Sequence, residues 1–192
     1  MAPPPVTAAI AIVSALAYSW YAHGTRGMKS VRAVRDGREY RVRDREDAQA
    51  ASETLAEIVR RCLALIAHLR EKAADDPRTE RLARRFDPEV VSELAEDEEG
   101  TSYSVDKGRS LVFCVRSRES GEIERMNTLT YVAVHELAHL AVDVIGHPPE
   151  FWKAFGWLLR HAVDAGVYAF EDYGKSEERY CGIDINSNVL AG

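Results

Sequence analysis

Hydrophobic residues recur every three or four positions over residues 47–74, and this spacing predicts a long helix packed through one face. The hydrophobic stripe consists of Leu55, Ile58, Val59, Cys62, Leu65, Ile66 and Leu69. A break at Asp75-Asp76-Pro77 separates it from a second helical stretch at residues 79–85. The segment FDPEVVSELAEDEEG, residues 86–100, predicts another short helix that leads into an acidic loop.

The pattern changes to period two in the segment TSYSVDKGRSLVFCVRSRESGEIERMN, residues 101–127. It predicts a hairpin turn at Asp106-Lys107-Gly108 and a strand over residues 110–116. Ile183 and Ile185 alternate in the same way and indicate a short strand. Strands combined with helices in this arrangement predict an α+β fold, with helices packed on a small antiparallel sheet.

Two segments precede this folded region. Residues 24–47 alternate Val and Tyr with Arg around Asp36-Gly37, which indicates a linker or a short exposed hairpin. We therefore divide the chain into an apolar N-terminal segment at 1–25, a linker at 26–46 and a folded domain at 47–192.

The segment from Val6 to Tyr21 contains no charged residue. As a helix it would rise about 24 Å, which is near the thickness of a bilayer core. Arg26 and Lys29 follow it, so we expect a membrane anchor, a transmembrane helix that leaves the domain facing the cytoplasm. A cleaved signal and an ordinary N-terminal helix packed on the domain are the alternatives, and the second would make the protein cytoplasmic.

The chain has 192 residues, of which 46% are hydrophobic, enough for the core of one domain. Its 25 Lys and Arg against 31 Asp and Glu give a formal net charge of −6. The arginines are interspersed with acids, which argues against a dedicated nucleic-acid surface.

The cysteines at positions 62, 114 and 181 lie beside apolar residues, and no two of them form a CxxC pair. We expect three reduced cysteines in the core and a reducing compartment. This spacing excludes a cysteine-rich zinc knuckle, so a metal site would consist mainly of histidine and carboxylate.

The segment HELAH places His135 and His139 four residues apart, and on a helix both rings project from one face. Two such rings can bind one zinc ion at about 2.0–2.1 Å. Glu136 is next to the first ligand, where it acts as general base on a metal-bound water in this motif. The preceding residues LTYVAV are apolar, as expected for a helix buried in a core.

A catalytic zinc site has three protein ligands and one open position. Asp143 lies on the same helical face but about 9 Å along the axis from the histidine pair, so we expect it to hydrogen-bond to a ligand or to be solvated. His147 follows Gly146 and precedes Pro148-Pro149, and a chain reversal there can return its ring to the ion if the helix ends before about Val144.

Other candidates for the third ligand are His161, on the next predicted helix, and Glu150, which is better explained as an acid at a helix N-terminus. His68 lies at the edge of the first helical stripe and is expected to be a surface or capping residue.

The segment LVFCVRSRESGEIERMNTLTYVAVHELAHLAVDVIGHPPEFWKAF resembles the WLM and SprT-like zinc metallopeptidases. In that family a strand ending in an Arg-containing loop precedes HExxH, and a third histidine is followed closely by an aromatic pair, here Phe151-Trp152. The likeness covers roughly residues 102–155, and the spacing from His139 to His147 is longer than in typical members.

The resemblance implies a zincin-like fold with HExxH on the active-site helix. It implies His135, His139 and His147 as zinc ligands and Glu136 as the base. Members of this family cleave proteins, some of them crosslinked to DNA, but the identity of the substrate does not carry over.

We therefore predict a Zn²⁺-dependent metallopeptidase that hydrolyses a protein or peptide substrate. Tyr180 would stabilise the oxyanion or, alternatively, cap the core. The strand at Leu111–Val115 would be the edge on which an extended substrate pairs. The alternative function is a membrane-anchored binding or scaffold protein with a structural or vestigial zinc site, although such a site has no need of Glu136 as a base.

Overall fold

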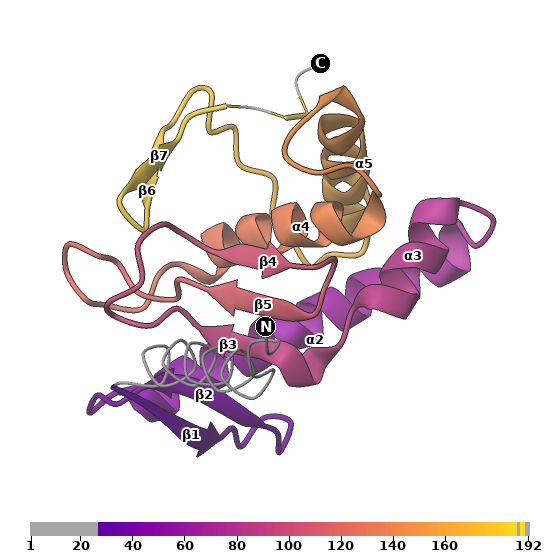
Figure 1. The fold of residues 1–192 in the computed structure, drawn as a ribbon. Coiled ribbons are helices and arrows are strands. Elements are labelled where there is room, and N and C mark those ends of the chain that lie inside the picture. The colour runs from indigo at the N-terminus through magenta and orange to yellow at the C-terminus, as the bar shows by residue number, and fades with distance from the viewer. Residues whose placement is uncertain (1–26, 188, 191–192) are drawn as a thin grey trace, which may run out of the picture.

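A computed structural model describes residues 27–187 and 189–190 of the chain. Its elements are β1 (Met28–Arg32), β2 (Glu39–Arg43), α2 (Ala48–Lys72), α3 (Pro77–Arg85), the 3₁₀ turn η1 (Pro88–Val90), β3 (Val91–Glu93), β4 (Tyr103–Val105), β5 (Ser110–Phe113), α4 (Met126–Ala141), α5 (Pro149–Asp164), β6 (Glu178–Tyr180) and β7 (Ile183–Ile185). In Figure 1, α2 lies behind the sheet, α4 lies alongside β4, and α5 packs on α4. The fold is mixed α and β.

The predicted membrane anchor at residues 6–21 lies outside the described residues, so the anchor and the localisation that depends on it stay predictions. Of the helices in the part of the chain that the structure describes, none is long and apolar enough to cross a bilayer.

The main sheet is mixed, which corrects the prediction of an antiparallel one. Its strand order is β1-β2-β3-β5-β4, in which β2 and β3 are parallel, β3 and β5 are parallel, and the two outer pairs are antiparallel. The helices α2 and α3 connect β2 to β3, and a helical crossover of this kind joins parallel strands. A separate hairpin pairs β6 with β7, as the alternation of Ile183 and Ile185 indicates.

Two of the predicted segments are different in the structure. Residues 28–43 form the β1–β2 hairpin of the main sheet, which matches the alternative of a short hairpin and not the linker, so the domain begins before residue 47. Residues 86–100 contain one 3₁₀ turn and the strand β3 instead of a helix. The reason is the β-branched pair Val90-Val91, since Val91 is buried and pairs with Leu111 of β5.

The long helix α2 confirms the prediction from the hydrophobic stripe. The stripe residues from Leu55 to Leu69 are all buried. The helix packs through them on the sheet and on α4. The second predicted helix is α3, where Asp76 caps the N-terminus by accepting a hydrogen bond from the backbone N–H of Arg78 at 2.9 Å.

A buried arginine joins the sheet to the start of α2. Arg116 follows β5 and is 1% exposed, and its Nε donates to Glu93 at 2.7 Å. It also pairs with Asp47, the residue before α2. A buried charge is tolerated only when it is paired, so this pairing is needed for the packing of α2 on the sheet.

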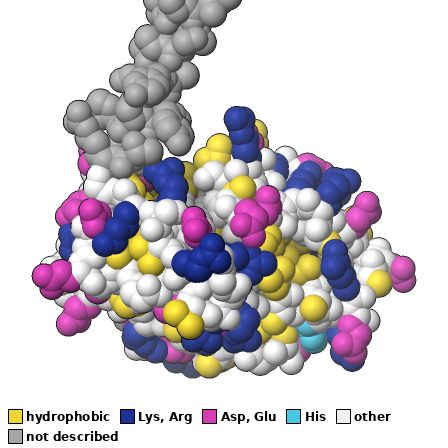
Figure 2. Space-filling view, turned by 90° about the horizontal axis from the view of Figure 1, so that it is seen from below, with side chains coloured by type: hydrophobic (Ala, Val, Ile, Leu, Met, Phe, Trp, Pro, Cys, Tyr) yellow, Lys and Arg dark blue, Asp and Glu magenta, His cyan; other side chains and the backbone are white. Residues whose placement is uncertain are grey.

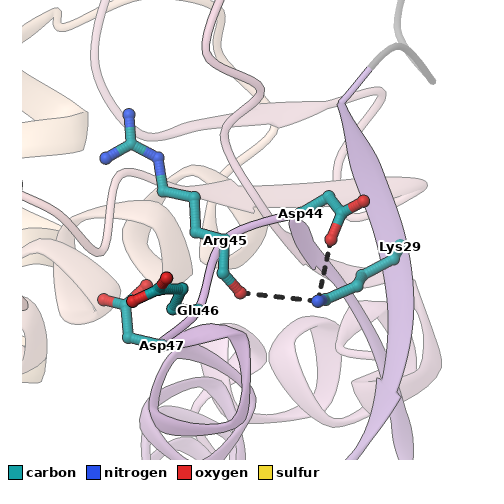
Figure 3. A pocket seen from close by; sticks show the side chains of 5 residues that line it. All are labelled: Lys29, Asp44, Arg45, Glu46 and Asp47. Atoms are coloured by element: carbon teal, nitrogen blue, oxygen red, sulfur yellow. Dashed lines mark hydrogen bonds and ion pairs between the residues drawn. The ribbon is translucent and has the colours of Figure 1, made fainter.

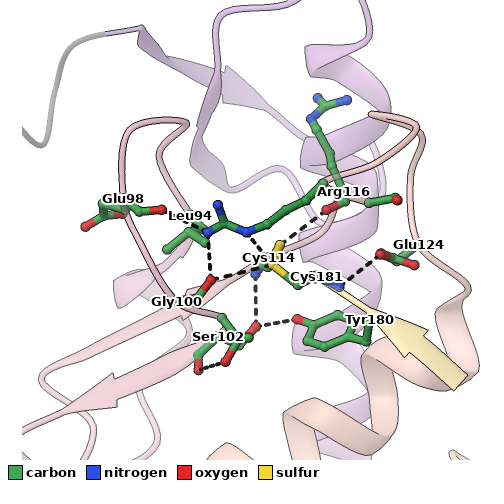
Figure 4. The surroundings of a disulfide bond; sticks show 12 residues. Leu94, Glu98, Gly100, Ser102, Cys114, Arg116, Glu124, Tyr180 and Cys181 are labelled. Atoms are coloured by element: carbon green, nitrogen blue, oxygen red, sulfur yellow. Dashed lines mark hydrogen bonds between the residues drawn. A yellow bond between two sulfur atoms is a disulfide. The ribbon is translucent and has the colours of Figure 1, made fainter. Parts of the chain in front are cut away.

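A disulfide joins Cys114, directly after β5, to Cys181 in the β6–β7 turn (Figure 4). The prediction of three reduced cysteines is therefore wrong for this pair, and with it the reducing compartment loses its support, because disulfides persist in oxidising environments. The apolar neighbours correctly indicated burial, but they do not show that two cysteines 67 residues apart come together. Cys62 is free and buried.

The β4–β5 turn falls at the predicted position and requires left-handed backbone. Asp106, Lys107 and Gly108 have φ values of 45°, 56° and 105°. A Cβ at Gly108 would lie 2.3 Å from the carbonyl oxygen of Arg85, so the turn can approach the end of α3 only with glycine at this position.

We expect Gly108→Ala to lower the free energy of unfolding by at least about 3 kcal/mol, because it combines a backbone clash with an unfavourable φ. Gly37→Ala is the matched control, since Gly37 has a φ of 74° but no atom within 4 Å of the place that a Cβ would occupy. Gly37→Ala should lower the free energy of unfolding by only about 1–2 kcal/mol. Equal losses in urea denaturation would show that the close approach to Arg85 is unimportant.

Candidate metal centre

The helix α4 carries the HELAH motif near its C-terminal end. It is largely buried, and His135 and His139 are the partly exposed positions of its second half. Because they are four residues apart, both rings project from the same face. Glu136, the residue after His135, is 3% exposed.

Cationic side chains cap the end of α4. Lys107 Nζ donates to the carbonyl of His139 at 3.1 Å, Arg85 donates to those of Leu140 and Val142 at 2.8 and 3.1 Å, and Arg81 donates to that of Ala141 at 3.3 Å. Helix ends leave carbonyl groups without intrahelical partners, and positive charges are favourable there. The helix therefore ends at Ala141, as a returning third ligand requires.

His147 returns to the two histidines of α4. The chain leaves the helix in an extended conformation at Val142 and turns at Gly146, which has a φ of 72°. His147 Nε2 then lies 3.1 Å from His135 Nε2 and 3.2 Å from His139 Nε2. Nitrogens that bind one tetrahedral zinc at about 2.0–2.1 Å are about 3.3–3.4 Å apart, so this spacing fits a shared ion.

The first turns of α5 pack against the three rings. Phe151 is fully buried, and its ring centroid lies 4.9 Å from that of His135 and 4.3 Å from that of His139. Trp152 is half-exposed and lies 5.7 Å from the His147 ring. The two aromatic residues hold the imidazoles in place from the side of α5.

The environment keeps the histidine pair neutral. Burial, together with smaller effects of neighbouring histidines, lowers the pKa of His135 to about 3 and that of His139 to about 4. Metal ions bind the neutral imidazole, so both rings are in the ligand form at neutral pH.

Glu136 is a buried carboxylate beside this cluster. Its Oε2 has no hydrogen-bond partner within the described part of the chain, and Ser104 bonds to the carboxylate. Burial raises the pKa of Glu136 to about 7, while the Ser104 bond lowers it. A carboxyl group with this pKa can both take and release a proton near neutral pH.

A cavity of about 510 Å³ opens over the histidines and Glu136. It is lined by Thr101, Ser102, Tyr103, Ser104, Asp106, Lys107, His135, Glu136, His139, Ile145, Gly146 and His147. The strand that borders it is β4, the last strand of the sheet, whereas β5 lies between β3 and β4. The edge predicted at Leu111–Val115 is therefore an inner strand, and β4 is the edge next to the site.

Tyr180 does not line this cavity. It is 1% exposed, and its hydroxyl forms a 2.6 Å hydrogen bond with Ser102 Oγ, which accepts a bond from the backbone N–H of Cys114 (Figure 4). The position matches the alternative interpretation, a tyrosine that caps the core beside the disulfide. The oxyanion role predicted for Tyr180 has no support in this arrangement.

The other candidate ligands lie apart from the cluster. Asp143 is largely exposed and pairs with Arg81 at 3.2 Å and Arg85 at 2.5 Å, so it supports the cap of α4 instead of a metal. Glu150 is exposed in the first turn of α5. His161, the alternative third ligand expected from the sequence, instead lies 3.2 Å from His68, which is only partly exposed.

A wider hollow of about 730 Å³ lies where β2 leads into α2, lined by Lys29, Asp44, Arg45, Glu46 and Asp47 (Figure 3). Lys29 Nζ lies 2.8 Å from the Asp44 carboxylate and 3.4 Å from the Arg45 carbonyl oxygen. None of the described residues that line it is a histidine or cysteine, and its lysine is already paired. Basic and acidic side chains are interspersed across the face seen in Figure 2.

The donor set is compatible with zinc. Three imidazole nitrogens lie within 4.8 Å of one another, and a carboxylate oxygen beside them lacks a partner in the described structure. The sequence did not indicate three residues around this donor set. Ser104 bonds to Glu136, and Lys107 and Arg85 donate to the carbonyl groups at the end of α4. The only local signal was the turn at residues 106–108, and nothing in the sequence connects it to α4.

Comparisons with known proteins identify viral relatives. The chain is 33% identical over 155 residues to "Uncharacterized protein R325" of Acanthamoeba polyphaga mimivirus, which covers 79% of each chain. It is 31% identical over 81 residues to "Uncharacterized protein 136R" of Invertebrate iridescent virus 6, covering 41% of this chain and 45% of that protein. It is 36% identical over 75 residues to "Uncharacterized protein 042R" of Invertebrate iridescent virus 3, covering 39% of this chain and 45% of that protein. No family model and no solved structure matches.

We expect Arg85→Met to lower the free energy of unfolding by roughly 2–3 kcal/mol, because it leaves two carbonyl groups at the end of α4 without their charged donor. It should also weaken zinc binding, since the segment that carries His147 starts there. The matched control is its neighbour Arg84, which is largely exposed and lies 3.9 Å from Glu80, so Arg84→Met should change stability by less than about 0.5 kcal/mol. Similar effects of the two variants in urea denaturation and zinc titration would contradict the role of the cap.

We expect Glu136→Gln to stabilise the metal-free protein by roughly 1–3 kcal/mol at pH 8, because it removes a buried charge with an unpartnered oxygen. The folded-state pKa of Glu136 is raised from 4.5 to about 7, so the folded protein binds more protons between these values and its stability falls as pH rises through that window. The variant should lack this fall, whereas Glu150→Gln, at an exposed position, should retain it. The measurement is urea denaturation with chelator at several pH values.

Proposed function

We propose that this chain, which belongs to the same family as the mimivirus protein R325, is a zinc-dependent metallopeptidase. The observation that carries the proposal is the convergence of three imidazole nitrogens beside a buried carboxylate with an unpartnered oxygen, all on one cavity. His135, His139 and His147 would bind the ion. A zinc ion bound there would polarise the scissile carbonyl and lower the pKa of a coordinated water.

Glu136 acts as general base and then as general acid. Its carboxylate takes a proton from the attacking water and passes it to the leaving amine. The pKa of about 7 suits both steps, since the group exchanges its proton near neutral pH. Ser104 holds the carboxylate through one hydrogen bond, and Oε2 has no partner among the described residues.

The substrate would be a protein or peptide bound in extended form along β4. This strand is at the edge of the sheet, and its residues Tyr103 and Ser104 line the cavity. An edge strand offers backbone donors and acceptors to an added strand. The substrate edge in this proposal is therefore β4, in place of the strand expected from the sequence.

The alternative is a binding or scaffold protein with a structural or vestigial zinc site. A structural site is closed by four protein ligands. Here three histidines converge next to an open cavity, and a carboxylate remains buried at a cost to stability. These features support the enzyme over the scaffold.

The test uses His135→Ala, Glu136→Gln and the control Glu150→Gln with a denatured protein as substrate. His135→Ala should lose one zinc ion per chain and all activity, because two ligands bind a catalytic ion weakly. Glu136→Gln should keep its zinc and lose activity by a factor of roughly 10²–10⁴, the usual contribution of a general base. Glu150→Gln should behave like the unaltered protein.

Cleavage is followed by mass spectrometry of the products and zinc by elemental analysis. Unchanged turnover in Glu136→Gln would refute the enzyme mechanism. Zinc binding without any turnover in the unaltered protein would favour the scaffold.

A further inference from the structure

A second cluster of metal-ligating groups lies at the far end of α5. His68 comes from the last turns of α2, and His161 and Asp164 come from the last turn of α5. His68 Nε2 lies 3.2 Å from His161 Nδ1, and a carboxylate oxygen of Asp164 completes a group whose ligand atoms all lie within 4.8 Å of one another. The peptidase mechanism uses none of these residues.

The cluster is separate from the first site. His161 is ten residues after Phe151, so it lies about 15 Å further along α5 than the aromatic ring that packs on the ligands of α4. The two histidines are 93 residues apart in the sequence, and only the packing of α2 against α5 brings them together.

The surrounding charges favour a cation. Asp164 is negative, and Arg78, the nearby cation, forms hydrogen bonds to Asp76 and lies over the Trp157 ring at 3.9 Å from its centroid. Asp76 and Arg78 thus neutralise each other, which leaves the charge of Asp164. The C-terminal ends of α2 and α5 add the negative ends of two helix dipoles.

The histidine pair is also accessible. Both rings are partly exposed and Asp164 is exposed, so an ion can enter from solvent.

We propose that His68, His161 and Asp164 bind a second zinc ion, which joins the C-terminal ends of α2 and α5. Two imidazoles and a carboxylate are a common zinc donor set. The nitrogen spacing of 3.2 Å is close to the 3.1 and 3.2 Å found in the first cluster. A simple hydrogen bond between the rings would account for that spacing but not for the carboxylate. By fixing one end of α5, this ion would stabilise the helix whose other end packs on His135 and His139.

The second site does not depend on the proposed enzymatic activity, and zinc stoichiometry tests it directly; the expected total of two ions includes the first site of the proposed function. After dialysis against zinc, the unaltered protein should hold about two ions per chain, and His68→Gln and Asp164→Asn should each hold about one. The double variant His135→Ala/His139→Ala isolates the second site and should also hold about one ion. Asp97→Asn, at an exposed position of the acidic loop, is the control and should behave like the unaltered protein.

A second readout keeps the test valid if a variant is unstable. Zinc should raise the Tm of the double variant lacking the first site, and His68→Gln added to it should abolish that rise. The proposal is overturned if the double variant binds no zinc, or if His68→Gln and Asp164→Asn bind as much as the unaltered protein. Either result would leave a hydrogen-bonded histidine pair as the explanation.

Discussion

Satisfying the carbonyl groups at the end of α4 is the constraint on which the cluster of His135, His139 and His147 depends. Lys107, Arg85 and Arg81 donate to the carbonyls from His139 to Val142. Ala141 and Val142 are almost fully buried, so these carbonyls have little access to water. Had the helix continued, His147 would lie about 12 Å along the axis from His139, too far to share an ion with it. The cationic cap permits the helix to end early and the chain to turn back.

The cap also joins parts of the chain that are distant in sequence. Lys107 belongs to the β4–β5 turn and Arg85 to α3. Asp143, in the loop that follows α4, pairs with Arg81 and Arg85. Gly108 lets the turn approach α3 closely enough for Lys107 to reach the carbonyl of His139 in α4. The sheet edge at β4 and the loop that carries His147 are thus positioned by the same few contacts, so β4 and the histidines lie in a fixed arrangement.

The parts that could be predicted from the sequence are those with a local signal. The hydrophobic period reveals α2, the glycine turn reveals the β4–β5 hairpin, and the motif places His135 and His139 on one helical face. The parts that could not be predicted depend on distant contacts. β3 is three residues long and takes its conformation from pairing with β2 and β5, so its local sequence predicts a helix and not the strand that forms. The edge position of β4 and the hydrogen bond between Tyr180 and Ser102 also depend on contacts between residues that are distant in the sequence.

The disulfide between Cys114 and Cys181 has a consequence for the unfolded chain. The loop that it closes spans 67 residues and contains all of α4 and α5, with every histidine of both clusters except His68. In the chain-entropy model, closing a loop of this length lowers the entropy of the denatured ensemble by an amount equivalent to about 4 kcal/mol. A backbone nick within the loop would leave two pieces that remain covalently joined. A chain that unfolds with this disulfide intact therefore regains the geometry of the histidine cluster by searching the conformations of a closed ring instead of those of a free chain.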